Sequence, residues 1–193
     1  VFELYEAHCK ANELIDFAEL LVRSYELLKN NTELLAHYQN RFEHILVDEF
    51  QDTNTIQYKW IKLLSSGKNQ IFCVGDDDQS IYGWRGAKIE NIQKLESDFH
   101  PIQTIRLEQN YRSTGNILGA SNALIANNSN RLGKSLWTDA GDGDLIDIYE
   151  ARTEIDEADY VVSTIQKYID DGVLPNECAI LYRSNAQSRG FEE

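Results

Sequence analysis

The stretch Ile45-Leu-Val-Asp-Glu-Phe-Gln-Asp52 decides how the rest of the chain is interpreted. Its three consecutive aliphatic residues, 45–47, predict a short strand buried on both faces, as in a parallel sheet. Asp48 and Glu49 follow where that strand ends, and open α/β sheets bind ligands at the carboxyl ends of their strands. Two carboxylates beside a dry core are costly unless a cation or a reacting water engages them. The alternative is an acidic strand end that is solvated and carries no chemistry.

A second apolar run, residues 71–74, also leads into acids, in the segment Gly75-Asp-Asp-Asp-Gln79. A helix through residues 56–64 separates the two runs. Strand–helix–strand crossovers are parallel and right-handed, so both acidic ends are expected at the same edge of the sheet. This co-location favours a functional site, in which Asp48 holds Mg²⁺ and Glu49 activates a water.

The composition excludes several classes of protein. A hydrophobic fraction of 42% with 10% aromatic residues is typical of a globular protein. No apolar run approaches the length of a membrane span, and no signal peptide is visible. Three scattered cysteines, Cys9, Cys73 and Cys178, fit a reducing, cytoplasmic compartment. The net charge of −14 argues against a non-specific nucleic-acid binder, which should carry a basic face.

Residues 80–87, Ser-Ile-Tyr-Gly-Trp-Arg-Gly-Ala, place two large aromatic residues and an arginine among glycines. Glycines allow tight turns and close approach to a ligand. Loop aromatics beside a guanidinium can stack on the bases of single-stranded nucleic acid. The alternative is that Tyr82 and Trp84 are buried beneath the loop as part of the core.

The second half of the chain predicts three more strands, over residues 102–107, 145–149 and 178–182, and a helix over residues 154–169. Arg112 precedes a helix that Ser113 or Thr114 would cap, and a helix N-terminus favours anions such as phosphate. The alternative is a surface arginine paired with Glu108.

The ends of the chain are typical of an internal piece of a longer protein. Val1 begins within a helical pattern, and the sequence stops at Glu193 within another helical start. The sequence Gly-x-x-x-x-Gly-Lys-Ser/Thr, which cradles phosphates in many nucleotide-binding proteins, does not occur. We therefore expect this piece alone not to hydrolyse ATP.

Four segments in order, residues 45–53, 74–87, 107–114 and 179–189, resemble motifs II (Walker B), III, IV and IVa of UvrD-type superfamily 1 DNA helicases. The resemblance covers essentially the whole chain. It implies an α/β fold of RecA-like parallel sheets flanked by helices, with pieces of two motor domains.

The resemblance also implies that the chain consists of three parts. Residues 1–43 would be the helical end of an inserted subdomain. Residues 44–108 would be the C-terminal part of the first motor domain. Residues 109–193 would be the N-terminal part of the second.

On the nucleotide side, the resemblance implies that Asp48 holds Mg²⁺ on ATP and that Glu49 is the general base for the attacking water. Gln79 would sense the γ-phosphate. Tyr111 would pack on the adenine. Arg112 would reach the γ-phosphate as an arginine finger, which stabilises charge in the transition state of phosphoryl transfer.

On the DNA side, the resemblance implies that Tyr82 and Trp84 contact single-stranded DNA, with Trp84 stacking on a base and Arg85 in the same loop. Arg183 and Asn185 would be a further DNA contact, and an arginine after a strand end can meet a backbone phosphate.

The implied activity is that of an ATP-dependent 3′–5′ helicase and translocase, which unwinds duplex DNA in repair and replication. Its partners would be single-stranded and duplex DNA and the proteins of mismatch and excision repair, in the cytoplasm. Three other interpretations of the acidic strand ends stay open: a Mg²⁺-dependent nuclease, a receiver-type phosphoacceptor and a non-enzymatic nucleic-acid-binding module.

Overall fold

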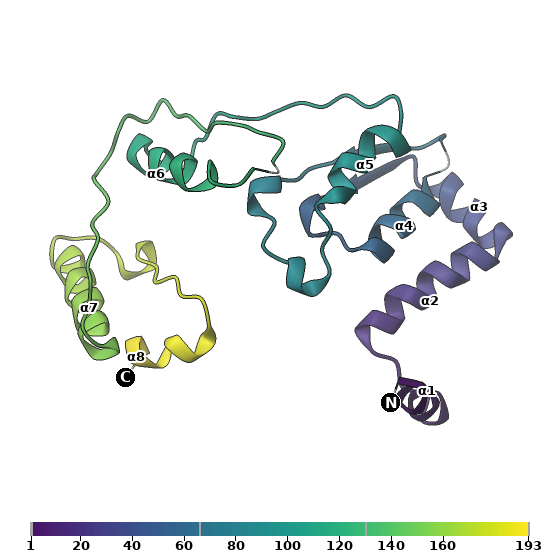
Figure 1. Cartoon of the computed structure of the whole chain (residues 1–193), viewed down its shortest axis with the longest axis horizontal. Helices are drawn as coiled ribbons and strands as arrows, with labels where there is room; N and C mark the ends of the chain where they lie inside the picture. Colours follow the sequence, from purple (N-terminus) through teal and green to yellow (C-terminus); the bar gives the residue numbers. More distant parts are fainter. Residues whose placement is uncertain (1, 66, 130, 193) are drawn as a thin grey trace. The chain divides into compact units, whose positions relative to one another are not determined.

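The computed structural model describes residues 2–65, 67–129 and 131–192, so the predicted helical pattern at Val1 and the chain end at Glu193 lie outside it. The chain divides into two compact units, Val1–Gly141 and Asp142–Glu193, and each is described by itself. Figure 1 shows the helices and strands of both units along the chain. The domain boundary predicted near residue 108 stays a prediction.

The centre of the first unit is a pair of parallel strands, β1 (His44–Val47) and β2 (Gln70–Cys73), in which Ile45 lies opposite Ile71. Helix α4 (Thr55–Leu64) connects them. Asn54 begins α4 as its N-cap, because its side-chain oxygen accepts hydrogen bonds from two backbone N–H groups of the first turn. The predicted strand–helix–strand unit and its parallel pairing are confirmed.

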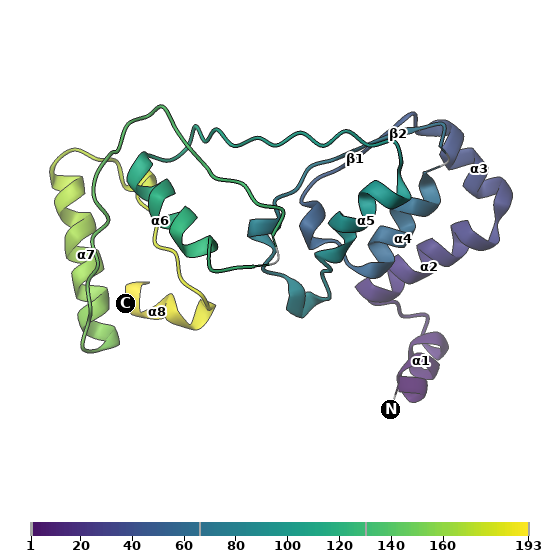
Figure 2. The same cartoon turned by 45° about the horizontal axis from the view of Figure 1, so that its top comes forward.

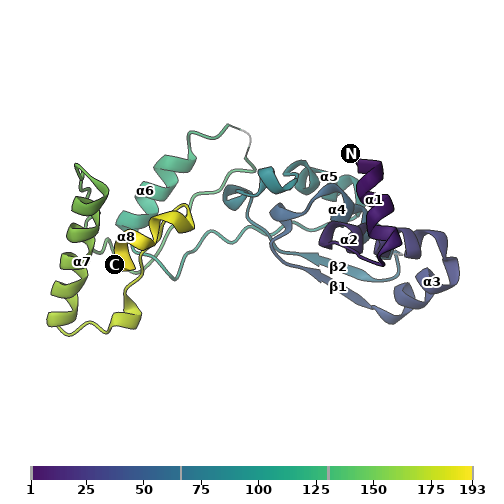
Figure 3. The same ribbon diagram turned by 90° about the horizontal axis from the view of Figure 1, so that it is seen from below.

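Helices α4 and α5 (Glu90–Asp98) lie against one face of this sheet, as Figure 3 shows. Phe50 is 2% exposed there and packs with Tyr58 and Ile61 beneath the inward side chains of both strands. The prediction that the first strand is buried on both faces is wrong. Leu46 is 74% exposed and Phe72 is 63% exposed, because strand side chains alternate and no described segment buries this second face.

The N-terminal part is helical, as predicted, with α1 (Phe2–Ala11), α2 (Phe17–Asn30) and α3 (Thr32–Arg41). The side chain of Asp16 caps α2 by accepting from the N–H of Glu19, and Asn31 caps α3 in the same way. Helices α2 and α3 pack against α4, which joins this part to the sheet.

The three strands predicted in the second half are absent from the described residues. Their segments are extended and exposed, with Leu107 at 82%, Ile148 at 94% and Leu181 at 91%. Figure 2 shows the first of them as a long trace that precedes α6 (Gly115–Ile125). A strand needs the hydrogen bonds of a neighbouring strand. Outside β1 and β2, the described chain offers only two isolated bridges, and the second predicted sheet is therefore not formed.

Helix α6 is tied to the loop that follows it. The Asn122 side chain donates to the Leu136 carbonyl at 2.8 Å and accepts from the Leu136 N–H at 3.1 Å. Trp137 forms a parallel bridge with Gln109, which precedes α6. The loop is therefore held both by α6 and by the segment that leads into it.

The second unit contains α7 (Glu154–Asp170) and α8 (Arg189–Glu192), which pack together. The rings of Tyr149 and Tyr160 stack with centroids 3.8 Å apart, and the Tyr149 hydroxyl donates to Asp156 at 2.9 Å. Within the described residues, none of the helices has both the length and the apolar character that crossing a bilayer requires.

The one-sided core predicts unequal costs for two phenylalanines. Phe50→Ala removes a ring that is 2% exposed and should lower the free energy of unfolding of the chain by about 3–5 kcal/mol. Phe72→Ala, on the uncovered face, is the matched control and should cost less than about 1 kcal/mol. Urea unfolding followed by circular dichroism measures both. Equal costs for the two variants would contradict the one-sided core.

Candidate functional site

The acidic end of β1 is a tight, left-handed turn. Asp48 and Glu49 are both exposed, and Glu49 has φ of 49°, a conformation that costs an L-residue about 1–2 kcal/mol. A carboxylate oxygen of Asp48, Oδ1, accepts from the N–H of Glu49 at 2.9 Å. The chain then enters a short 3₁₀ helix, η1 (Phe50–Asp52). Backbone strain of this kind persists where the surroundings enforce it, and it is concentrated at functional sites.

The ends of the two strands are joined by backbone hydrogen bonds. The N–H of Val74 donates to the Val47 carbonyl at 2.8 Å, and the N–H of Phe50 donates to the Val74 carbonyl at 3.0 Å. The acidic segments after β1 and β2 therefore leave the sheet side by side. This confirms that both acidic ends lie at one edge of the sheet.

Gln51 is the link between these two segments. Its side chain is 1% exposed, and its amide contacts Glu49 on one side and the backbone of Asp76 on the other. The backbone of Gly75 comes so close that an added Cβ would lie 2.9 Å from Oε1 of Gln51. Only glycine accommodates that approach. The sequence offers no signal for this contact, because glutamine side chains are mostly exposed in folded proteins.

The acids after β2 are engaged by groups from far along the sequence. Oδ1 and Oδ2 of Asp78 accept from Nε and Nη2 of Arg131 at 2.8 and 2.5 Å, a bidentate pair that is largely buried. Oδ2 of Asp77 accepts from the N–H of Leu132 at 2.6 Å. Lys134 forms an ion pair with Asp76.

These contacts bear on metal binding. Oxygens of Asp76, Asp77 and Asp78 lie within 4.8 Å of one another, the spacing of a metal site. Since the protein's own cations already engage two of the three acids and a backbone N–H engages the third, the cluster is compensated internally. This pairing has a possible signal in the sequence: two basic residues, Arg131 and Lys134, occur in one loop, and three acids occur in another.

The short helix η2 (Asp77–Gln79) places Gln79 beside Asp76, and Nε2 of Gln79 donates to Oδ2 of Asp76 at 2.7 Å. Burial acts to raise the pKa of Asp76, but hydrogen bonds from Lys134 and Gln79 outweigh it and hold the pKa below its ordinary value. Gln79 is therefore tied to the turn that follows β2.

Residues 80–87, called the aromatic loop below, follow directly after Gln79 and contain a third 3₁₀ helix, η3 (Gly83–Arg85). The guanidinium of Arg85 lies 4.6 Å from the ring centroids of both Tyr82 and Trp84, within cation–π range. Trp84 is 70% exposed, so the alternative that it is buried as core is wrong. The loop closes back on the strand end, because the N–H of Lys88 donates to the Thr53 carbonyl at 3.0 Å.

Tyr111 and Arg112 lie apart from this network. Tyr111 is 84% exposed, and its hydroxyl donates to Oε1 of Gln109 at 2.8 Å. The side-chain oxygen of Asn110 accepts from the N–H of Arg112, just before α6. Among the described residues, the Arg112 side chain forms no ion pair with Glu108, and no ion pair joins it to the end of β1.

Arg183 and Asn185 are exposed in the second unit, at the short helix η5 (Asn185–Gln187). Oε1 of Gln187 accepts from the N–H groups of Arg183 and Ser184 at 3.0 and 2.9 Å. This local cap holds the two predicted DNA contacts next to each other.

The chain matches the UvrD/REP helicase N-terminal domain over residues 1–100 and the UvrD-like helicase C-terminal domain over residues 105–193. The chain belongs to the UvrD/REP helicase family. The acidic strand end, Gln79 and the aromatic loop all lie within the segment that matches the N-terminal domain of this family.

Individual members of the UvrD/REP helicase family are similar over the whole chain. The chain is 59% identical to DNA helicase II of Haemophilus influenzae and 59% identical to DNA helicase II of Escherichia coli. It is 51% identical to the ATP-dependent DNA helicase PcrA of Staphylococcus epidermidis. Each match covers 100% of this chain but only 26–27% of the relative, so the chain spans about a quarter of their length.

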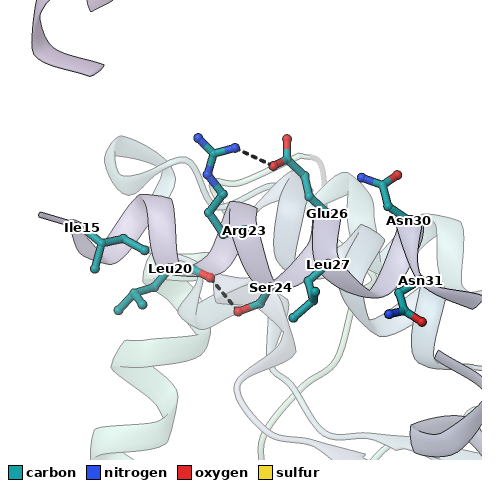
Figure 4. A pocket seen from close by; sticks show the side chains of 8 residues that line it. All are labelled: Ile15, Leu20, Arg23, Ser24, Glu26, Leu27, Asn30 and Asn31. Carbon is teal, nitrogen blue, oxygen red and sulfur yellow. Dashed lines mark hydrogen bonds and ion pairs between the residues drawn. The ribbon is translucent and has the colours of Figure 1, made fainter. Parts of the chain in front are cut away.

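A separate hollow runs along α2, away from the residues that the helicase motifs single out. Figure 4 shows Arg23 paired with Glu26 on its rim and the Ser24 hydroxyl bonded to the Leu20 carbonyl. It is lined by Ile15, Leu20, Arg23, Ser24, Glu26, Leu27, Asn30 and Asn31. None of the predicted site residues contributes to it.

The depressed pKa of Asp76 predicts a pH-dependent contribution to stability. A carboxylate whose pKa is lower in the folded state stabilises the fold above its unfolded pKa of about 3.9, and the contribution is lost as the pH falls through the folded value. Lys134→Met should therefore lower the free energy of unfolding by about 1 kcal/mol at pH 7 and by progressively less below about pH 4. Urea unfolding of both proteins across this pH range measures the difference.

Lys59→Met is the control, because Lys59 is an exposed lysine on α4. It should change the free energy of unfolding by less than about 0.5 kcal/mol at every pH. A cost of Lys134→Met that is the same at pH 7 and pH 3 would show that its pairing with Asp76 is not the cause.

Proposed function

We propose that this chain is the central part of an ATP-dependent 3′–5′ DNA helicase, and that it carries one side of the ATP site together with a single-stranded DNA contact. The observation that supports this most is the continuous path from Glu49 through Gln51 and Asp76 to Gln79, which runs directly into the aromatic loop. A change at the nucleotide can reach the DNA contact through this path.

On the nucleotide side, Asp48 fits a Mg²⁺ ligand, because it is an exposed carboxylate with only Oδ1 in a local hydrogen bond. Mg²⁺ prefers one or two carboxylates together with substrate phosphates and water. Bound Mg²⁺ would neutralise negative charge on the phosphates of ATP. Glu49 accepts the proton of the attacking water, and Gln79 senses the γ-phosphate.

Tyr111 and Arg112 supply the other side of the same nucleotide in this proposal. Tyr111 is exposed, as a ring that packs on adenine must be before ATP binds. Arg112 has no ion-pair partner in the described part of the chain, so its guanidinium is available to the γ-phosphate. ATP held between Asp48 and Arg112 would draw residues 44–108 and 109–193 together, and its hydrolysis would release them.

On the DNA side, Trp84 stacks on a base while Tyr82 and Arg85 line the same contact. The 70% exposure of Trp84 supports the stacking role, because a surface tryptophan next to a guanidinium offers both a π face and charge. Arg183 and Asn185 are proposed as a second contact, with the DNA backbone. Single-stranded and duplex DNA are the substrates, and mismatch-repair and excision-repair proteins are the proposed cytoplasmic partners.

Two structural features favour this function over its rivals. A nuclease or a receiver would use the acids after β2 in catalysis, whereas here Asp76 and Asp78 pair with lysine and arginine. The bare face of the sheet and the exposed extended segments are what a piece of a larger motor would show before the remaining strands cover them. Since the chain spans about a quarter of its relatives, we expect ATP turnover only in a longer protein.

The role of Glu49 predicts a loss of turnover. In the longer protein, Glu49→Gln should lower kcat for DNA-stimulated ATP hydrolysis by about 10²–10⁴-fold, because the water loses its general base. ATP binding should be nearly unchanged, because the amide keeps the shape of the side chain. A phosphate-release assay with single-stranded DNA measures the rate, and full turnover by the variant would overturn the assignment.

The role of Trp84 predicts weaker DNA binding. Trp84→Ala should weaken single-stranded DNA binding by about 5- to 150-fold, which corresponds to one lost base stack of about 1–3 kcal/mol. Stimulation of ATP turnover by DNA should fall as well, while the affinity for ATP is kept. Trp84→Phe retains a ring and should recover much of the binding. Fluorescence anisotropy with a labelled oligonucleotide measures the affinities, and equal affinity of the Ala variant and the wild type would contradict the stacking role.

A further inference from the structure

Gln51 makes two hydrogen bonds with its buried amide, and each goes to a different acidic segment. Nε2 donates to Oε2 of Glu49 at 2.6 Å, and Oε1 accepts from the N–H of Asp76 at 2.9 Å. The side chain is 1% exposed and follows directly after the buried ring of Phe50. The amide therefore uses both its donor and its acceptor across the gap between the two strand ends.

The chemistry of this position requires an amide. A carboxylate could accept from the N–H of Asp76, but it would place a second negative charge against Glu49. An aliphatic side chain would leave the N–H of Asp76 without this partner, at the cost of an unpaired, partly buried donor, and would leave Oε2 of the exposed Glu49 to water, with no fixed orientation. The backbone of Gly75 restricts Oε1 of Gln51 further, because a Cβ at Gly75 would lie only 2.9 Å from that oxygen.

The bond to Glu49 has a directional consequence. Glu49 has a left-handed backbone, with φ of 49°, and its Oε2 is held by Gln51. Among the described residues, no donor is bonded to Oε1 of Glu49. One oxygen of the carboxylate is therefore fixed, and the other is left for an incoming proton.

The bond to Asp76 extends the same connection. The carboxylate of Asp76 accepts from Nε2 of Gln79 at 2.7 Å and pairs with Lys134. Only Gln51 and Asp76 stand between Glu49 and Gln79. A displacement of the turn after β2 is therefore transmitted to the Glu49 carboxylate through a single buried side chain.

We propose that Gln51 is a positioning residue, which orients the carboxylate of Glu49 and couples its orientation to the turn that carries Gln79. This inference rests on the proposed function, in which Glu49 is the general base. Gln51 touches neither the nucleotide nor the water in this assignment and acts only through Glu49. Because misplacing a catalytic group by about 1 Å can cost about 10²-fold in rate, the effect of losing this contact is measurable.

The test uses Gln51→Glu and Gln51→Met in the longer protein. Gln51→Glu keeps an acceptor for the N–H of Asp76 but loses the donor to Glu49, and Gln51→Met keeps the length of the side chain and loses both bonds. Both variants should lower kcat for DNA-stimulated ATP hydrolysis by about 10- to 100-fold. The dissociation constant for ATP and the KM for ATP should stay within about twofold of the wild-type values.

Asn91→Asp is the matched control. Asn91 is 2% exposed and donates through Nδ2 to the Thr53 carbonyl at 3.0 Å, so it is a second buried amide close to the same segment. The substitution makes the same change from amide to carboxyl without contact to Glu49. It should lower the melting temperature about as much as Gln51→Glu while leaving kcat within about twofold of wild type.

The outcomes separate the inference from the proposed function. Folded Gln51 variants with wild-type kcat would overturn the inference, and so would an equal loss of kcat in Asn91→Asp. If Gln51→Glu does not fold, Gln51→Met decides by the same criterion. If the longer wild-type protein does not hydrolyse ATP, or if Glu49→Gln hydrolyses it at the wild-type rate, the proposed function fails. The inference then falls with it.

Discussion

The parallel pairing of β1 with β2 is the constraint on which the rest of the site depends. It brings the ends of two strands to one edge, and the N–H of Phe50 is bonded there to the carbonyl of Val74. Three features follow from this edge: the left-handed turn at Glu49, the buried Gln51, and the turn that leads to Gln79 and the aromatic loop. Helices α4 and α5 support it from one face only.

A second set of contacts holds this edge from outside the motif segments. Arg131 and Lys134 reach the acids after β2 from a loop that follows α6, about fifty residues later in the chain. Because residues 109–193 are proposed to belong to the second motor domain, these ion pairs would tie one motor segment to the other close to Gln79, the proposed γ-phosphate sensor. Because the Arg131–Asp78 pair is largely buried, separating it would leave unpaired charges at a high cost, so these contacts favour one defined arrangement of the two segments.

The centre of this fold can be predicted well from sequence, since an apolar run, a helix and a second apolar run leave few alternatives to a parallel pair. The bare second face of the sheet cannot be predicted from sequence. Leu46 and Phe72 are apolar residues on that face whether or not another layer covers them. The strands predicted over residues 102–107, 145–149 and 178–182 have the right local pattern but lack a neighbour to pair with. The bonds from Gln51 to Asp76 and from Arg131 to Asp78 cannot be predicted from sequence for a related reason: each joins residues that are distant in the chain.

The bare strand pair has a consequence for how the chain behaves among copies of itself. In the described part of the chain, each strand has only one neighbour, so each presents one open edge of N–H and C=O groups beside an uncovered apolar face. Open edges of this kind are templates for aggregation. The net charge of −14 opposes such association by mutual repulsion. Salt shortens the reach of that repulsion to about 10 Å at 0.1 M, so the colloidal stability of the chain depends on ionic strength as well as on folding.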